Sequence, residues 1–128
     1  MTNATILIVD DDPNIRELLS VNLMSAGYAV VEASDGREAI GKMQDSPPDL
    51  IVLDIMMPEI DGWEFCKFVR DDPLLEKIKI IMLTARGAEK DKLIGREIFK
   101  ADEYMTKPFD IETLLNMLRA VEPGGGAN

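Results

Sequence analysis

Three runs of four apolar residues are spaced along the chain, and each is followed at once by a residue that can do chemistry. The runs cover residues 6–9, 50–53 and 80–83, and a shorter, mixed run covers residues 103–105. The residues just beyond them are Asp10, Asp11, Asp54, Thr84 and Lys107. Strands that are apolar throughout are typical of a parallel sheet covered on both faces, and the carboxyl ends of such strands share one edge. We therefore expect these polar residues to converge on one pocket.

Amphipathic helical patterns fill the gaps between the runs. Helices are predicted near residues 13–26, 36–46, 63–71, 89–99 and 111–121, and one further strand near residues 29–32. Five strand–helix units predict an α/β fold with a doubly wound, five-stranded parallel sheet. Two strand orders are plausible, and the flavodoxin-like order 2-1-3-4-5 places strands 1, 3, 4 and 5 side by side. That order would bring the polar strand ends together.

The first predicted helix has a clear start and an apolar face. Asp12 followed by Pro13 is typical of an N-cap with proline at the first helical position. The spacing of the apolar residues predicts which side of the helix is buried. The face predicted to be buried carries Ile15, Leu18, Leu19, Leu23 and Ala26, whereas Arg16, Glu17 and Ser20 lie off it.

Length and composition indicate a single soluble domain. The chain has 128 residues, predicted to form one domain over residues 1–122 with a flexible, glycine-rich tail or linker over 123–128. No apolar run approaches the roughly 20 residues that span a bilayer, and no export signal opens the chain. The single Cys66 fits a reducing compartment. We therefore expect a cytoplasmic protein without membrane contact.

The net charge and the lack of histidine argue against several classes of function. The net charge is −10, from 24 acidic against 14 basic residues, which argues against direct nucleic-acid binding because a phosphate backbone selects basic faces. The chain contains no histidine. Catalysis that pairs serine or cysteine with histidine is therefore excluded, and the chain cannot itself be a phosphohistidine donor.

The acidic residues at the strand ends indicate a metal site. Asp10, Asp11 and Asp54 would repel one another without a cation, so their grouping suggests a hard divalent metal such as Mg²⁺. Taken singly, each polar residue also has a structural role that needs no chemistry. A lone Asp54 can cap a turn, a lone Lys107 can lie on the surface, and Thr84 suits a strand because it is β-branched.

Four motifs in order resemble the response-regulator receiver domain of bacterial two-component signalling. They are Ile8-Val9-Asp10-Asp11-Asp12, the segment from Asp54 to Gly62 with Met56 and Pro58, Leu83-Thr84-Ala85-Arg86, and Tyr104-Met105-Thr106-Lys107-Pro108-Phe109. The resemblance covers residues 5–121. It implies the strand order 2-1-3-4-5 and a signalling module that is not a turnover enzyme but assists its own phosphorylation and dephosphorylation.

The resemblance also implies a role for each site residue. Asp54 would accept a phosphoryl group from the phosphohistidine of a partner histidine kinase or histidine phosphotransfer protein. Asp10, Asp11, Asp54 and the backbone carbonyl of Met56 would hold Mg²⁺. Thr84 and Lys107 would contact the phosphoryl group, and Lys107 would precede a cis peptide bond at Pro108. Tyr104 would act with Thr84 as a switch that changes the nearby surface.

We expect the predicted switch to act on a downstream effector protein or on an output domain that is missing from this chain. Receivers of winged-helix transcription factors dimerise through charged pairs, and the resemblance to them is partial. Four residues match that pattern, and they are Lys92, Glu97, Asp102 and Arg119. Thr113 and Met117 stand where charged partners are common. We therefore expect a monomer or a weak, phosphorylation-dependent dimer.

Two other classes of function compete with the signalling switch. A Mg²⁺-dependent phosphohydrolase with an aspartyl-phosphate intermediate needs an Asp-x-Asp pair after the first strand, which residues 10–12 formally supply. However, Pro13-Asn14 follows where threonine or valine is expected, and the chain has no room for a cap domain. The third possibility is an interaction domain that is never phosphorylated, against which the complete set of site residues argues.

Overall fold

The computed structural model describes residues 4–54, 62–84, 102–107 and 109–121. Over these ranges strands and helices follow one another along the chain. In order they are β1 (Thr5–Val9), α1 (Pro13–Ser25), β2 (Ala29–Ala33), α2 (Gly36–Asp45), β3 (Leu50–Asp54), α3 (Gly62–Asp71), β4 (Lys79–Thr84), β5 (Glu103–Thr106) and α5 (Ile111–Val121). The helix expected near residues 89–99 and the tail expected over 123–128 lie outside the described residues.

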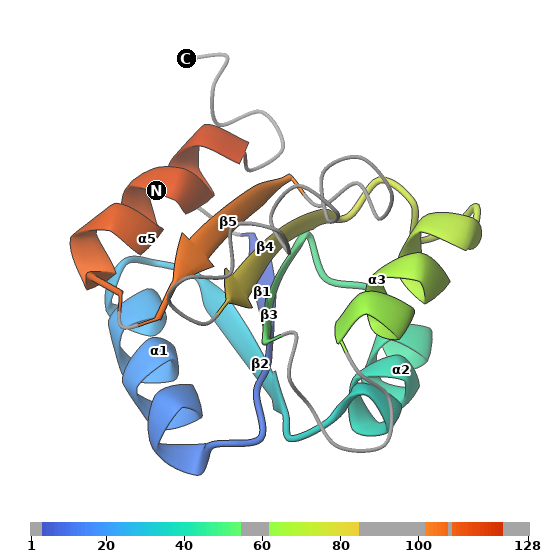
Figure 1. The fold of residues 1–128 in the computed structure, drawn as a ribbon, viewed down its shortest axis with the longest axis horizontal. Coiled ribbons are helices and arrows are strands. Elements are labelled where there is room, and N and C mark those ends of the chain that lie inside the picture. The colour runs from blue at the N-terminus through green and yellow to red at the C-terminus, as the bar shows by residue number, and fades with distance from the viewer. Residues whose placement is uncertain (1–3, 55–61, 85–101, 108, 122–128) are drawn as a thin grey trace.

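All five strands form one parallel sheet in the order β2-β1-β3-β4-β5 (Figure 1). The predicted fold class and strand order are therefore confirmed. β1 lies inside the sheet, where Leu7 is paired with Val31 of β2 on one side and with Ile51 of β3 on the other. Because all strands are parallel, their carboxyl ends lie at the same edge of the sheet.

Helices cover both faces of the sheet, with α1 and α5 on one side and α2 and α3 on the other (Figure 1). The alternation of side chains along β3 shows why this strand is apolar at every position. Ile51 and Leu53 belong to the core beneath α2 and α3, whereas Leu50 and Val52 belong to the core beneath α1 and α5. Each strand residue is thus buried on one face or the other.

Side-chain caps fix where the first two helices begin. The Asp12 carboxylate accepts a hydrogen bond from the Asn14 amide at 2.9 Å, and Asp35 accepts one from the Glu38 amide at 2.8 Å. The predicted N-cap at Asp12 is confirmed. Beyond the end of α1, Gly27 has a φ of 101°, a left-handed conformation that glycine adopts at low cost and that commonly ends a helix.

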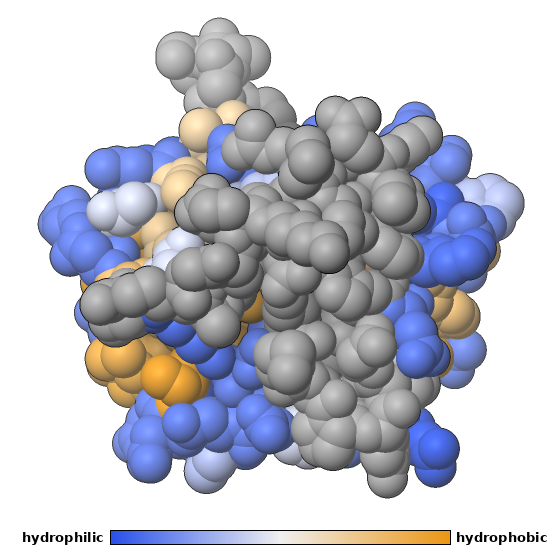
Figure 2. All heavy atoms as spheres, viewed as in Figure 1, coloured by the Kyte–Doolittle hydropathy of each residue, from blue (hydrophilic) through white to orange (hydrophobic). Residues whose placement is uncertain are grey.

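The buried face of α1 differs from the predicted one in two residues. Leu18 is 46 % exposed, whereas Ser20 is buried. The buried face is centred on Leu19, and the side chain of Leu18 points about 100° away from it because a helix has about 3.6 residues per turn. Leu18, Val21 and Met24 are all exposed on α1. Figure 2 shows hydrophobic side chains over this helix, on a described surface that is otherwise largely hydrophilic.

Among the described helices, none combines the length and the apolar character needed to cross a membrane.

Candidate functional site

The sheet register brings the polar strand ends together. β3 ends at Asp54, which pairs with Leu83, and β4 ends at Thr84, which pairs with Thr106 of β5. Lys107 follows β5 directly, as Asp10 follows β1. Because the strands are parallel neighbours, these positions share one edge of the sheet, as the sequence predicted.

Three carboxylates converge at this edge. Asp10, Asp11 and Asp54 each offer an oxygen, and these oxygens all lie within 4.8 Å of one another. Asp10 and Asp54 are buried, with exposed fractions of 0 % and 6 %, whereas Asp11 is exposed. The cluster, called the acidic cluster below, therefore has two carboxylates inside the protein and one at its mouth.

Lys107 bridges the two buried carboxylates. Its ammonium nitrogen lies 3.1 Å from Asp10 Oδ2 and 3.2 Å from Asp54 Oδ2. Three carboxylates against one ammonium leave two negative charges among these four residues. The site is therefore prepared to receive additional positive charge.

The pKa values of Asp10 and Lys107 are both raised, for different reasons. Burial raises the pKa of Asp10 above 3.8, and the Asp12 amide and the Lys107 charge only partly offset it. For Lys107, burial acts to lower the pKa, but the charges of Asp10 and Asp54 outweigh it and the pKa lies above 10.5. At neutral pH Lys107 is therefore firmly protonated.

Asp10 is held in place by hydrogen bonds with four separate groups, donating in one and accepting in three. Its amide donates to Ala33 O at 3.2 Å, and its carbonyl accepts from Arg16 Nη1 at 2.7 Å. Its Oδ1 accepts from the Asp12 amide at 2.9 Å, and its Oδ2 accepts from Lys107. The sequence did not single out Arg16, because a contact between a helix side chain and a strand-end carbonyl leaves no pattern in the sequence.

The remaining predicted site residues are only partly described. Thr84 occupies the end of β4, but its side chain lies outside the described residues, as do Met56 and Pro108. Tyr104 is buried, 5 % exposed, in the core beneath α2 and α3. The structure thus brings together Asp10, Asp11, Asp54 and Lys107.

The donor set of the acidic cluster fits Mg²⁺. Carboxylate oxygens are hard ligands, which Mg²⁺ prefers, and it commonly uses one or two carboxylates together with waters and a phosphate group. Three such oxygens within 4.8 Å of one another, with Asp11 open to solvent, meet that requirement.

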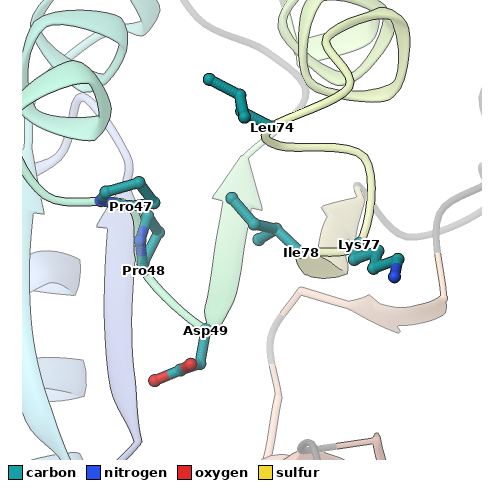
Figure 3. A pocket seen from close by; sticks show the side chains of 6 residues that line it. All are labelled: Pro47, Pro48, Asp49, Leu74, Lys77 and Ile78. Carbon is teal, nitrogen blue, oxygen red and sulfur yellow. The ribbon is translucent and has the colours of Figure 1, made fainter.

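A pocket of about 280 Å³ lies away from the acidic cluster. It is formed by Pro47, Pro48 and Asp49 before β3, and by Leu74, Lys77 and Ile78 before β4 (Figure 3). These segments precede the strands, so the pocket lies at the amino edge of the sheet. Asp49 already accepts a hydrogen bond from the Thr5 amide at 2.8 Å. We assign no chemistry to this pocket.

Two of the residues expected at a dimer interface, Asp102 and Arg119, make hydrogen bonds within this chain. Asp102 Oδ2 accepts hydrogen bonds from Arg70 Nη2 and from the Ile80 amide, both at 2.8 Å. Arg119 donates to Asn116 Oδ1 at 3.2 Å. Lys92 and Glu97 lie outside the described residues.

Comparison with known proteins identifies the family. The sequence profile of the response regulator receiver domain matches residues 6–119. The chain is 47 % identical over 119 residues to the alkaline phosphatase synthesis transcriptional regulatory protein PhoP of Bacillus subtilis, covering 93 % of this chain and 48 % of PhoP. It is 46 % identical to the phosphate regulon transcriptional regulatory protein PhoB of Pseudomonas aeruginosa, covering 94 % and 52 %. The chain thus spans about half the length of these relatives.

The similarity to a solved structure agrees with this family assignment. The chemotaxis protein CheY4 of Vibrio cholerae superposes with a TM-score of 0.87 at 40 % identity, covering 94 % of this chain and 99 % of CheY4. The sequence-based resemblance is confirmed, and the phosphohydrolase alternative is not favoured. The chain belongs to the response regulator receiver domain family, whose members are signalling modules of two-component systems.

Proposed function

We propose that Asp54 accepts a phosphoryl group from the phosphohistidine of a partner histidine kinase or histidine phosphotransfer protein. The observation that carries this proposal is the position of the Asp54 carboxylate, at the end of β3 and 3.2 Å from the Lys107 ammonium. A carboxylate nucleophile beside a fixed cation suits a reaction in which negative charge must approach negative charge.

The proposed transfer needs no reactant other than Asp54 and the phosphohistidine of the donor. One Asp54 oxygen attacks phosphorus, a P–O bond forms, and the P–N bond to the donor imidazole breaks. The imidazole leaves with the electron pair of that bond, and Asp54 becomes an acyl phosphate. Lys107 offsets charge on the phosphoryl oxygens, and Asp10 keeps the Lys107 ammonium at the site through its 3.1 Å contact. Hydrolysis of the acyl phosphate by water at the same site would reset the module.

We assign Mg²⁺ binding to Asp10, Asp11 and Asp54, with the Met56 carbonyl added by family resemblance. When bound, Mg²⁺ supplies positive charge that neutralises the phosphoryl oxygens. Asp11 is exposed and so can bind a metal ion from solvent, whereas Asp10 is buried and already bonded to Lys107. Asp11 is therefore the better candidate for direct contact with the metal.

The proposed output is a change of the surface near Tyr104. A phosphoryl group on Asp54 adds charge and acceptor oxygens beside the end of β4, where Thr84 stands. Thr84 would move towards it, and Tyr104, on the neighbouring strand, would follow. Since PhoP and PhoB are named as transcriptional regulators and are about twice as long as this chain, a DNA-binding output elsewhere in a longer protein fits this proposal. A separate effector protein would be reached through the same surface.

Labelling with a small phosphodonor tests the proposal. The wild-type protein, incubated with acetyl phosphate and Mg²⁺, should carry one phosphoryl group that borohydride reduction and peptide mass spectrometry place on Asp54. Asp54→Asn should abolish it, whereas Asp71→Asn, an exposed aspartate at the end of α3, should not. Label that persists on the Asp54→Asn protein at another residue would contradict the assignment. Steady turnover of a phosphate monoester would instead favour the phosphohydrolase.

A further inference from the structure

Arg16 lies in the first turn of α1 and points back towards the end of β1. Its Nη1 donates to the Asp10 carbonyl at 2.7 Å, and its Nε lies 3.4 Å from Glu32 Oε1 at the end of β2. The Arg16 side chain is 19 % exposed. The two contacts use different nitrogens of one planar guanidinium, and a lysine, with a single nitrogen, cannot reproduce that geometry.

The carbonyl that Arg16 holds belongs to the peptide bond between Asp10 and Asp11. The orientation of this peptide sets where the chain leaves β1 and therefore where both carboxylates point. The Asp10 side chain is fixed separately, by the Asp12 amide and by Lys107. Asp11 shares the peptide bond that Arg16 contacts, so the direction of its side chain follows the orientation of that bond.

We propose that Arg16 is a positioning residue for the acidic cluster. By holding the Asp10 carbonyl while Glu32 holds Arg16, it orients Asp10 and Asp11 in advance for a divalent cation. This inference rests on the proposed Mg²⁺ site. Groups that orient metal ligands commonly affect metal affinity although they do not touch the metal.

The positive charge of Arg16 should weaken Mg²⁺ binding, whereas its positioning contacts should strengthen it. A cation near the acidic cluster repels Mg²⁺, although the ion pair with Glu32 reduces that repulsion. A role through charge alone therefore predicts that Arg16→Gln binds Mg²⁺ more tightly and that Arg16→Lys leaves binding unchanged. A positioning role predicts that both variants bind Mg²⁺ more weakly, because both lose the double contact.

An NMR-monitored Mg²⁺ titration of the folded proteins separates these roles. We expect about fivefold weaker binding for Arg16→Lys and for Arg16→Gln, the loss expected for one hydrogen bond. Arg119→Lys, the same chemical change in the last turn of α5, should bind like the wild type. Affinity equal to that of the wild type in both Arg16 variants, or tighter binding by Arg16→Gln, would overturn the inference.

Hydrogen exchange in metal-free protein provides a readout that does not need Mg²⁺. If Arg16 positions this segment, the Asp10 and Asp12 amides should exchange several-fold faster in Arg16→Lys, whereas the Val52 amide in the centre of the sheet should not change. Equal acceleration at Val52 would mean a general loss of stability and would overturn the positioning role. A wild-type protein that binds no Mg²⁺ would refute the proposed metal site, while the exchange rates would still decide whether Arg16 holds this segment.

Discussion

Removing the Lys107 charge should destabilise the metal-free protein, and Mg²⁺ should largely reverse the effect. In Lys107→Met the contacts at 3.1 Å to Asp10 and 3.2 Å to Asp54 are lost. With an effective dielectric constant of about 20, each contact contributes about 5 kcal/mol of gross attraction. The cost of removing the ammonium from water offsets most of this sum. Since the Lys107 side chain is 31 % exposed, we expect a net loss of about 2 kcal/mol.

Lys67→Met is the matched control. Lys67 lies only 2.6 Å from Asp71, closer than Lys107 lies to either partner, but both side chains are about two-thirds exposed. Removing this ion pair should change the free energy of unfolding by less than about 0.5 kcal/mol, because solvent screens it. The comparison therefore separates the effect of burial from the effect of distance.

Urea unfolding followed by circular dichroism, in EDTA and in saturating Mg²⁺, measures both effects. Mg²⁺ and Lys107 compete for the same carboxylates, so Mg²⁺ should stabilise Lys107→Met more than it stabilises the wild type. The reasoning is refuted if Lys107→Met is no less stable than Lys67→Met in EDTA. Equal stabilisation of the wild type and Lys107→Met by Mg²⁺ would refute the competition.

Three further predictions concern other aspartates. Asp12→Ala should lower the free energy of unfolding by about 1 kcal/mol through loss of the N-cap and leave Mg²⁺ affinity unchanged. Asp11→Ala should lose Mg²⁺ binding without that loss of stability. Urea unfolding and calorimetric titration measure the two effects, and the opposite pattern would contradict these roles. Burial raises the pKa of Asp10 above 3.8, so the folded protein binds this proton more tightly than the unfolded chain, and stability is lost as pH rises through the folded pKa. The stability difference between Asp10→Asn and the wild type in EDTA should therefore shift in favour of Asp10→Asn between pH 4 and pH 7, and a constant difference would contradict this sign. Asp102→Asn should cost about 1–2 kcal/mol in urea unfolding because it weakens the charge-assisted bond from Arg70, and an unchanged midpoint would show that this pair contributes little.

The sequence predicted the elements that depend on local pattern. The apolar runs before Asp10 and Asp54 became buried strands, and Asp12 became a helix cap. The strand order was predicted from family resemblance. That order brings Asp54 and Lys107 together although they are 53 residues apart in the chain.

Contacts that depend on packing angles could not be predicted in the same way. Leu18 fits an apolar face when the sequence is read alone, but the helix is rotated so that Leu19 faces the core and Leu18 faces solvent. The contacts of Arg16 with Asp10 and Glu32, and of Arg70 with Asp102, join elements whose separation is set only by the packed sheet. Nothing in the spacing of these residues specifies such pairs.

A phosphoryl group on Asp54 should change the surface near Tyr104, and two-dimensional NMR with a beryllofluoride mimic of that group tests this central proposal directly. With Mg²⁺ and beryllofluoride present, amide shifts should change at Asp10, Asp11 and Asp54, and also at Tyr104 and along α5, with smaller changes along the exposed face of α1. Asp54→Asn should show none of these changes. Shifts confined to the acidic cluster, with Tyr104 and α5 unmoved, would contradict a switch that signals through the surface near Tyr104.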